Sequence, residues 1–230
     1  MPTWSRAIGF ILLSISWALS AGLSFAVWYL RENKTIKAAQ PIFLQILLFG
    51  SAMTSGSILT LSLDEGLDID DSGLDIACQL TPWFFFLGMV TMYAGLFCKL
   101  WRLDMVTQFR RRQVTVKQVL WPLILLLAST IALLTVWTVV DPWTWEREII
   151  QELPPESYGQ CESANFAAYF APLCGLMVLA TALAVMMAWK TKNTNVDESL
   201  TDSNTVFYAV SSQLQAWFGE YCPCTLFFYP

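Results

Sequence analysis

Side chains that usually carry out chemistry are scarce in this chain, which contains 230 residues, six cysteines and no histidine. The lack of histidine removes the commonest general base and metal ligand. The sequence also contains no nucleophile elbow, no HExxH motif and no phosphate-binding loop. We therefore do not expect an enzyme, a cofactor or a metal site.

Two short patterns are typical of metal or redox chemistry when they stand in the right context. The segment from Asp64 to Asp75 contains six carboxylates and a D-x-D-D spacing, but the twelve-residue EF-hand pattern is absent. A solvated loop is therefore favoured over a calcium site. The second pattern is Cys222-Pro223-Cys224, near the end of the chain. Here a C-terminal tail without a redox or metal role is the favoured interpretation.

The composition indicates which elements must position these side chains. Hydrophobic residues make up 56% of the chain and charged residues 13%, whereas an average soluble domain is about 25% charged. Five apolar runs are each long enough to cross the ~30 Å hydrocarbon core of a bilayer as a helix. These runs, with a sixth that becomes irregular, cover about residues 7–30, 42–63, 79–100, 118–140, 163–189 and 205–219. The predicted fold class is therefore an all-α membrane protein.

The centres of the five complete spans contain no Asp, Glu, Lys or Arg. Ion pumps and proton-coupled transporters usually place ionisable groups at this depth, so a channel or transporter subunit is the less favoured alternative. The first run is longer than the 7–15-residue core of a cleavable signal peptide. Arg6 precedes this run, which leaves a signal anchor as the alternative interpretation of the first span.

Basic residues are distributed unevenly among the loops. Eleven of the thirteen lysines and arginines lie in or beside three alternate loops, and only Arg6 and Arg147 lie elsewhere. Twelve of the eighteen acidic residues lie in the two opposite loops, Asp64 to Asp75 and Asp141 to Glu162. Because cytoplasmic loops are enriched in lysine and arginine, we expect the N-terminus outside the cell and the three basic loops inside.

This topology places two cysteines at the outer face, where disulfides persist. Cys78 heads the third span, and Cys161 lies just before the fifth. A bridge between them would tie the second outer loop to the helices, while the alternative is two free thiols. We expect Cys98, at the inner face, and Cys174, within the bilayer, to be reduced.

Two opposite charges lie at the inner ends of different spans. Lys99 ends the third span, and Asp202 opens the sixth on the same side. If the two helices are neighbours, this pair would hold their inner ends together. The alternative is two solvated surface charges, since exposed pairs contribute only about 0–1 kcal/mol.

Several passages recur in an order that is typical of one receptor family. They are NKTIKAAQPIFLQILLFGS (33–51), Cys78 with GLFCKLWRLDMV (95–106), WTVVDPW (137–143), ESYGQCES (156–163), AWKTKN (188–193) and DSN (202–204). With these passages, the chain resembles the transmembrane domain of class C G-protein-coupled receptors over about residues 7–217. The resemblance is specifically to the metabotropic GABA-B-like branch. Each passage is weak alone, and the set is specific because of its order.

The resemblance implies a seven-helix receptor of the plasma membrane that transduces an extracellular signal to heterotrimeric G proteins. It implies a disulfide between Cys78 and Cys161 and an inner-face lock between Lys99 and Asp202. In this family the second and third inner loops contribute to the G-protein surface. The matching basic residues are Arg102, Arg110, Arg111, Arg112, Lys117, Lys190 and Lys192. The expected partners are a G protein, a second receptor chain in a homo- or heterodimer, and membrane lipid, but no nucleic acid.

The chain departs from the family pattern at both ends. Typical members have a large extracellular ligand-binding domain before the first span, where this sequence has about six residues. The sixth span should lead to a seventh, but the sequence diverges after Trp217. We therefore expect a seven-span bundle truncated to five complete spans and a partial sixth (1–217), with a divergent tail (218–230). The alternative function is a non-signalling membrane partner of full-length receptors.

The charge distribution predicts which loops are accessible from outside the cell. An epitope tag in the Asp64–Asp75 loop should be labelled on intact cells, because this loop lies opposite the basic ones. A tag beside Arg111 should be labelled only after permeabilisation. Immunofluorescence with and without detergent measures both tags, and labelling of the Arg111 tag on intact cells would reverse the predicted topology.

Overall fold

The computed structural model of the chain describes residues 3–33, 40–63, 70–108, 119–149 and 157–193. In these ranges it contains five helices and one two-stranded antiparallel sheet. All five helices are long and apolar enough to cross a membrane. The helices are α1 (Thr3–Tyr29), α3 (Pro41–Ser62), α4 (Asp71–Gln108), α6 (Trp121–Val140) and α7 (Phe166–Asn193), and the strands are β1 (Thr144–Ile149) and β2 (Ser157–Glu162).

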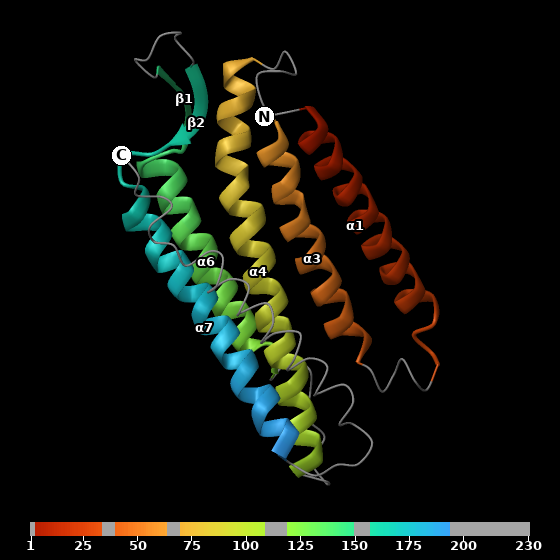
Figure 1. Cartoon of the computed structure of the whole chain (residues 1–230). Helices are drawn as coiled ribbons and strands as arrows, with labels where there is room; N and C mark the ends of the chain where they lie inside the picture. Colours follow the sequence, from red (N-terminus) through yellow and green to blue (C-terminus); the bar gives the residue numbers. More distant parts are fainter. Residues whose placement is uncertain (1–2, 34–39, 64–69, 109–118, 150–156, 194–230) are drawn as a thin grey trace.

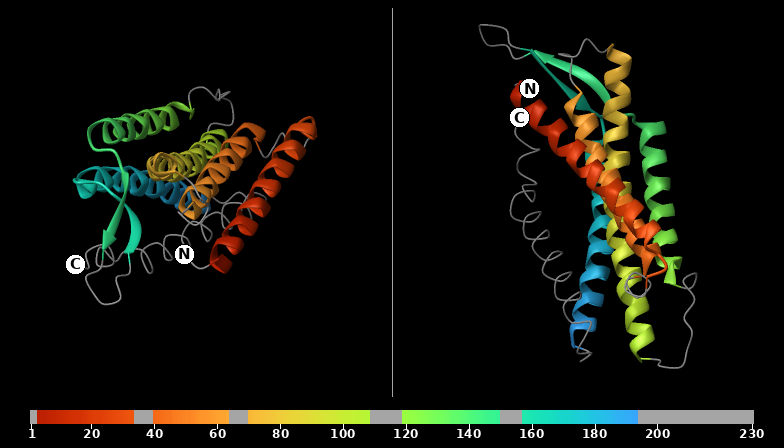
Figure 2. Two further views of the ribbon diagram at one scale, coloured as in Figure 1. Left: turned by 90° about the horizontal axis from the view of Figure 1, so that it is seen from above. Right: turned by 90° about the vertical axis from the view of Figure 1, so that its right-hand side faces the viewer.

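The helices form an elongated bundle with the β-hairpin at one end, which we call the hairpin end (Figure 1). We call the other end of the bundle the opposite end. Viewed from above, α4 lies between α3 on one side and α6 and α7 on the other (Figure 2). Helix α1 lies at the edge of the bundle and contacts α3. The expected all-α membrane bundle is therefore confirmed, with the hairpin as an addition to it.

Helix α4 is central because its apolar residues face neighbours on several sides. Of its apolar window, 56% is buried inside the protein, compared with 6% for α1. Its residues Val90 and Tyr93 share one buried cluster with Phe43 of α3, Leu123 of α6 and Met177 of α7. A helix that is apolar around most of its circumference has to be surrounded in this way.

The backbones of α3 and α4 approach each other closely at two glycines. A Cβ atom at Gly50 would lie 2.9 Å from the carbonyl oxygen of Gly88 and 2.9 Å from the backbone nitrogen of Met92. A Cβ atom at Gly88 would in turn collide with the side chain and backbone of Thr54. Helices in a membrane associate through close packing, which small residues make possible. The two glycines therefore determine how near α3 lies to the central helix.

Side-chain hydrogen bonds hold α1 against α3. The hydroxyl oxygens of Ser16 and Ser55 lie 2.7 Å apart. Nearer the other end of the helix pair, the Nε2 atom of Gln45 donates to the backbone oxygen of Ser24 at 2.8 Å. Each bond of this kind contributes about 0.6 kcal/mol in a membrane. The largely unburied α1 is thus held by several weak polar contacts.

The acidic loop predicted from Asp64 to Asp75 is wrong in its second half, because α4 begins at Asp71. The backbone oxygen of Asp70 accepts a hydrogen bond from the N–H of Leu74 and so starts the first turn. Carboxylates at a helix N-terminus are stabilised by the helix dipole. Leu74 is 1% exposed, so this additional turn is also held by packing. Residues 64–69 lie outside the described residues.

The inner loops were also predicted too long. Helix α4 continues to Gln108, past the predicted end of the third span at residue 100 and into the loop predicted over residues 103–117. Helix α7 continues to Asn193, past the predicted end at residue 189. Lys190 and Lys192 therefore lie in a helix rather than in a loop. An apolar run ends where charged residues begin. Lysine, arginine and glutamine are good helix formers, so the helix itself continues past the end of the apolar run.

The second outer loop, predicted as irregular from Asp141 to Glu162, contains both strands of the sheet. The segment TWEREI (144–149) contains the β-formers Thr144, Trp145 and Ile149, but its three central residues are all charged, so no regular alternation predicts this strand. The predicted sixth span at 205–219 and the tail at 218–230 lie outside the described residues.

The contact between α3 and α4 predicts that Gly88→Ala lowers the free energy of unfolding by about 1–3 kcal/mol, the usual cost of overpacking. The added methyl group would meet the backbone of Thr54. Gly175→Ala in α7 is the matched control, because a Cβ atom there has nothing within 4 Å. The control should be neutral or stabilising through helix propensity. Thermal unfolding in detergent compares the variants. If Gly88→Ala is as stable as the control, α3 and α4 can adjust to the added methyl group without cost.

Candidate functional site

At the hairpin end of the bundle, β1 and β2 pair in antiparallel register. Trp145 of β1 lies opposite Cys161 of β2, and Arg147 lies opposite Gly159. A Cβ atom at Gly159 would collide with the indole ring of Trp145, so the glycine leaves room for this ring to lie across β2. An isolated two-stranded hairpin is at best marginally stable in water. Its conformation therefore depends on support from the helices.

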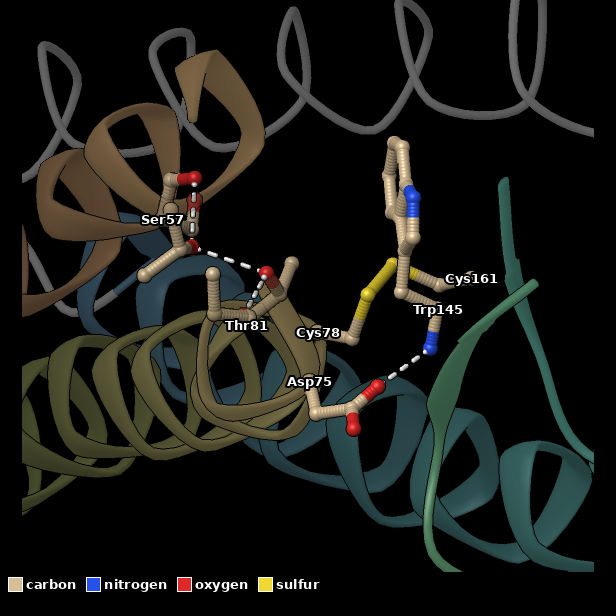
Figure 3. The surroundings of a disulfide bond; sticks show 8 residues. Ser57, Asp75, Cys78, Thr81, Trp145 and Cys161 are labelled. Carbon is tan, nitrogen blue, oxygen red and sulfur yellow. Dashed lines mark hydrogen bonds between the residues drawn. A yellow bond between two sulfur atoms is a disulfide. The ribbon is translucent and has the colours of Figure 1, made fainter. Parts of the chain in front are cut away.

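Two side chains of α4, about one turn apart, hold the two strands of the hairpin (Figure 3). Cys78 forms a disulfide with Cys161, with the two Cα atoms 5.8 Å apart. The Oδ1 atom of Asp75 accepts a hydrogen bond of 2.7 Å from the backbone N–H of Trp145. Because Trp145 and Cys161 are directly opposite in the sheet, the covalent bond and the hydrogen bond act on one pair of residues. The disulfide joins the two cysteines that the sequence analysis paired.

A second support lies where α6 ends and α7 begins. The Oδ2 atom of Asp141 accepts hydrogen bonds from the hydroxyl of Ser163 at 2.9 Å and from the backbone N–H of Asn165 at 2.7 Å. The N–H of Asn165 lowers the pKa of Asp141 below its usual value, and the Ser163 hydroxyl adds to this effect. The carboxylate thus joins the two ends of the segment that contains the hairpin.

Aromatic rings pack between α4, α6 and α7 next to the hairpin. The ring centroid of Trp137 in α6 lies 5.8 Å from that of Trp143 and 5.8 Å from that of Phe166. In α7, the ring of Phe170 lies 4.7 Å from Phe166 and 5.6 Å from Phe86 of α4. Such pairs contribute about 0.5–1.5 kcal/mol each beyond the burial of their surface. They form a packed base on which the hairpin rests.

At the opposite end of the bundle, an ion pair joins α4 to α7. The Nζ atom of Lys190 donates a hydrogen bond of 2.8 Å to the Oδ2 atom of Asp104. The side chain of Asp104 is 4% exposed, and that of Lys190 is 53% exposed. Lys190 was predicted to lie in a loop, and this placement is wrong, because the residue lies in α7. Its predicted contact with a G protein stays a prediction.

The structure describes only some of the other residues that were predicted at the inner face. Lys99 is half-buried in α4, whereas its predicted partner Asp202 lies outside the described residues, so the lock stays a prediction. Arg102 is also half-buried, and its Nε atom has no hydrogen-bond partner among the described residues. Lys192 lies within α7. The remaining basic residues, Arg110, Arg111, Arg112 and Lys117, lie outside the described residues.

The carboxylates in these contacts hold backbone groups and a lysine side chain in place. Asp75 and Asp141 accept hydrogen bonds from backbone N–H groups, and Asp104 is paired with a lysine. In the described part of the chain, no three side chains of Cys, Asp or Glu gather as metal ligands. The described contacts therefore connect elements of the bundle to one another.

Comparison with known proteins agrees with a bundle of long apolar helices. A family model described as "7 transmembrane sweet-taste receptor of 3 GCPR" matches residues 2–222. The chain belongs to the class C G-protein-coupled receptor family. The resemblance that the sequence analysis drew from short passages is confirmed by this match, which covers nearly the whole chain.

This class C receptor chain is similar to GABA-B receptor subunits. It is 24% identical over 211 residues to "Gamma-aminobutyric acid type B receptor subunit 2" of Caenorhabditis elegans, an alignment that covers 85% of this chain and 25% of the relative. Proteins of the same name from Rattus norvegicus and Homo sapiens are 23% and 22% identical over 195 residues, which is 78% of this chain and 20% of each relative. The chain thus spans a quarter or less of the length of these curated relatives.

The contacts of Asp75, Asp104 and Asp141 in this receptor chain were not predicted from the sequence. Asp75 precedes Cys78 by three residues, a spacing that places both on one helix face. This spacing is informative only if the helix is known to begin before Cys78. Asp104 is the one acidic residue between Lys99 and Lys117, which singles it out, but nothing in the sequence identifies Lys190 as its partner.

The disulfide predicts that Cys78→Ser and Cys161→Ser each lower the free energy of unfolding by about 2–4 kcal/mol, since the bond closes a long loop. The two cysteines are 83 residues apart. The double variant should equal the single ones, because each removes the same bond. Cys174→Ser is the control, since this residue is outside the disulfide. Thermal unfolding with and without reductant measures the effect, and alkylation of both thiols in fresh membranes would contradict the bond.

Proposed function

We propose that this chain is the transmembrane part of a GABA-B-like receptor that transduces an extracellular signal to heterotrimeric G proteins. Membership of the class C family and similarity to GABA-B subunit 2 over most of the chain support the proposal. The observation that carries it is the bonding of α4 at both ends. The helix is bonded to the hairpin through Cys78 and Asp75 and to α7 through Asp104. A displacement of the hairpin would therefore move α4, and α4 would transmit this movement to the opposite end of the bundle.

In this proposal the hairpin end faces the outside of the cell at the plasma membrane, and the opposite end faces the cytoplasm. The disulfide at the hairpin end supports this orientation, because disulfides persist in oxidising compartments. The excess of lysine and arginine in the loops of the opposite end supports it as well. Helix α1 begins at the hairpin end (Figure 1), so the N-terminal side of the chain would lie outside.

The proposed G-protein surface lies at the opposite end, where α4 and α7 end. Basic side chains there would contact the G protein, as the family resemblance implies. Lys99 and Asp202 would favour the resting arrangement of the third and sixth spans. The residues proposed for the contact are Arg102, Arg110, Arg111, Arg112, Lys117, Lys190 and Lys192.

The test measures guanine-nucleotide exchange on a panel of heterotrimeric G proteins. Membranes contain the chain alone or together with GABA-B subunit 2 of Caenorhabditis elegans as a candidate dimer partner. We expect Lys99→Ala and Asp202→Ala in this chain to raise basal exchange about five- to tenfold, because a shift of little more than 1 kcal/mol changes a two-state population by such a factor. Arg31→Gln is the control, since it removes a positive charge from the end of α1.

The variants separate a transducing chain from a silent one. Raised exchange that depends on a substitution in this chain supports transduction through it. If both variants reach the surface and exchange is unchanged in every membrane, the proposed function is wrong. Co-purification of the chain with the partner subunit, without any effect on exchange, would identify a non-signalling membrane partner instead.

A further inference from the structure

The hairpin is attached to α4 by two links of different kinds. One is covalent, the disulfide between Cys78 and Cys161. The other is the hydrogen bond of 2.7 Å from the backbone N–H of Trp145 to the Oδ1 atom of Asp75. The hydrogen bond does not require the disulfide, because no sulfur atom takes part in it. The hairpin can therefore lie against α4 before the disulfide forms and after it is reduced.

Asp75 and Cys78 lie on one face of α4, in a segment that other contacts hold in place. They are three residues apart, a spacing that places both side chains on the same side of a helix. The backbone oxygen of Asp70 accepts a hydrogen bond from the N–H of Leu74 and starts this helical turn. Leu74 is 1% exposed, so packing holds the turn as well. The acceptor atom of Asp75 is therefore in place whether or not Cys78 is oxidised.

On the hairpin, the register of the two strands connects Trp145 to Cys161. The two residues lie directly opposite each other, and the indole ring of Trp145 occupies the space that Gly159 leaves free. A slip by one residue would turn every side chain of a strand to its other face, and Cys161 would then point away from α4. By holding Trp145, Asp75 therefore also holds Cys161 against α4 (Figure 3).

The two cysteines of the disulfide differ in their access to water. Cys78 is 2% exposed, whereas Cys161 is half-buried in β2. A soluble disulfide such as oxidised glutathione therefore reaches Cys161 more easily than Cys78. The buried thiol of Cys78 depends on β2 to bring a reacting sulfur atom to it.

We propose that Asp75 positions the hairpin for disulfide formation, so that Cys161 and Cys78 are joined within a hairpin that already lies against α4. The thiolate of Cys161 attacks oxidised glutathione and breaks its S–S bond, which releases one glutathione thiolate and leaves a mixed disulfide. The thiolate of Cys78 then attacks the Cys161 sulfur and releases the second glutathione. The two protein thiols lose two protons and two electrons, and glutathione gains them. This role of Asp75 does not rest on the proposed function, because it concerns only the hairpin and α4.

The second step of this reaction is the one that Asp75 accelerates. It joins two groups of the same chain, so its rate depends on how often Cys161 lies beside Cys78. Hydrogen bonds to a charged acceptor are among the stronger ones in proteins, so loss of the Asp75 carboxylate should leave the hairpin out of place more often. The first step uses the accessible side of Cys161 and should change little. The mixed disulfide should therefore accumulate when Asp75 is removed.

The test follows re-oxidation of the full chain in lipid nanodiscs, after reduction with dithiothreitol and its removal. Oxidised glutathione is added, and free thiols are blocked with N-ethylmaleimide at intervals. Mass spectrometry of the peptides that contain Cys78 and Cys161 measures free thiol, mixed disulfide and the bond between the two residues. We expect Asp75→Ala to slow closure of the bond about tenfold and to raise the share of Cys161 that carries glutathione.

Asp75→Asn is the matched control, because it is as neutral as Asp75→Ala but retains a side-chain oxygen that accepts a hydrogen bond. It should close the bond within about threefold of the unchanged chain. The effect of charge alone has the opposite sign. A negative charge disfavours the thiolate of a nearby cysteine, so its loss would speed closure in both variants. Asp70→Asn removes a charge from the same end of α4 and should leave the rate unchanged.

Equal closure rates in Asp75→Ala and the unchanged chain would overturn the proposal. So would equal slowing in Asp75→Ala and Asp75→Asn, since the acceptor oxygen would then have no role. If the reduced Asp75→Ala chain does not stay folded, hydrogen exchange in the double variant of Cys78→Ser and Cys161→Ser decides. Its Trp145 N–H should remain protected without any disulfide, because the acceptor is intact. Exchange as fast as in an unfolded peptide would overturn the proposal, since the hydrogen bond would then need the disulfide.

Discussion

A polypeptide inside a bilayer has to satisfy its backbone hydrogen bonds within itself, and α4 does so as one continuous helix of 38 residues. At about 1.5 Å per residue it is roughly 57 Å long, whereas the hydrocarbon core is about 30 Å thick. Its ends therefore extend beyond the apolar region, where polar side chains can bond to other elements. Asp75 and Cys78 bond to the hairpin at one end, and Asp104 bonds to α7 at the other. Helices α3, α6 and α7 and strand β1 all contact this helix, and α1 is placed through its contact with α3.

The two ends of α4 are held by different kinds of interaction. At the hairpin end, a covalent bond and a hydrogen bond act on the opposite residues Trp145 and Cys161. The hairpin and α4 therefore move together under conditions that keep the disulfide intact. At the other end the contact is ionic, and Lys190 is half-exposed, so water competes for it. A helix with a permanent contact at one end and a reversible contact at the other suits a protein that changes shape across a membrane.

Sequence patterns agree best with the structure where one physical term dominates. Transfer of apolar side chains out of water determined the five spans, and the compartment chemistry of thiols indicated the pair of Cys78 and Cys161. The patterns agree least at helix ends, where the loops predicted around Asp71 and Lys190 are partly helical. Hydropathy changes sign at a charged residue, but a helix continues through such residues if they have partners. Those partners lie on other elements and leave no local signal.

The sequence by itself therefore determined that the chain crosses a membrane as helices, which runs do so, and to which receptor family it belongs. These properties depend on the local succession of apolar and charged residues and on short passages in a fixed order. Tertiary structure alone decided that Gly50 and Gly88 let α3 approach α4, and that Asp104 is paired with Lys190. Asp104 and Lys190 are 86 residues apart along the chain. Their contact is determined by how the helices pack against one another, which no local pattern in the sequence encodes.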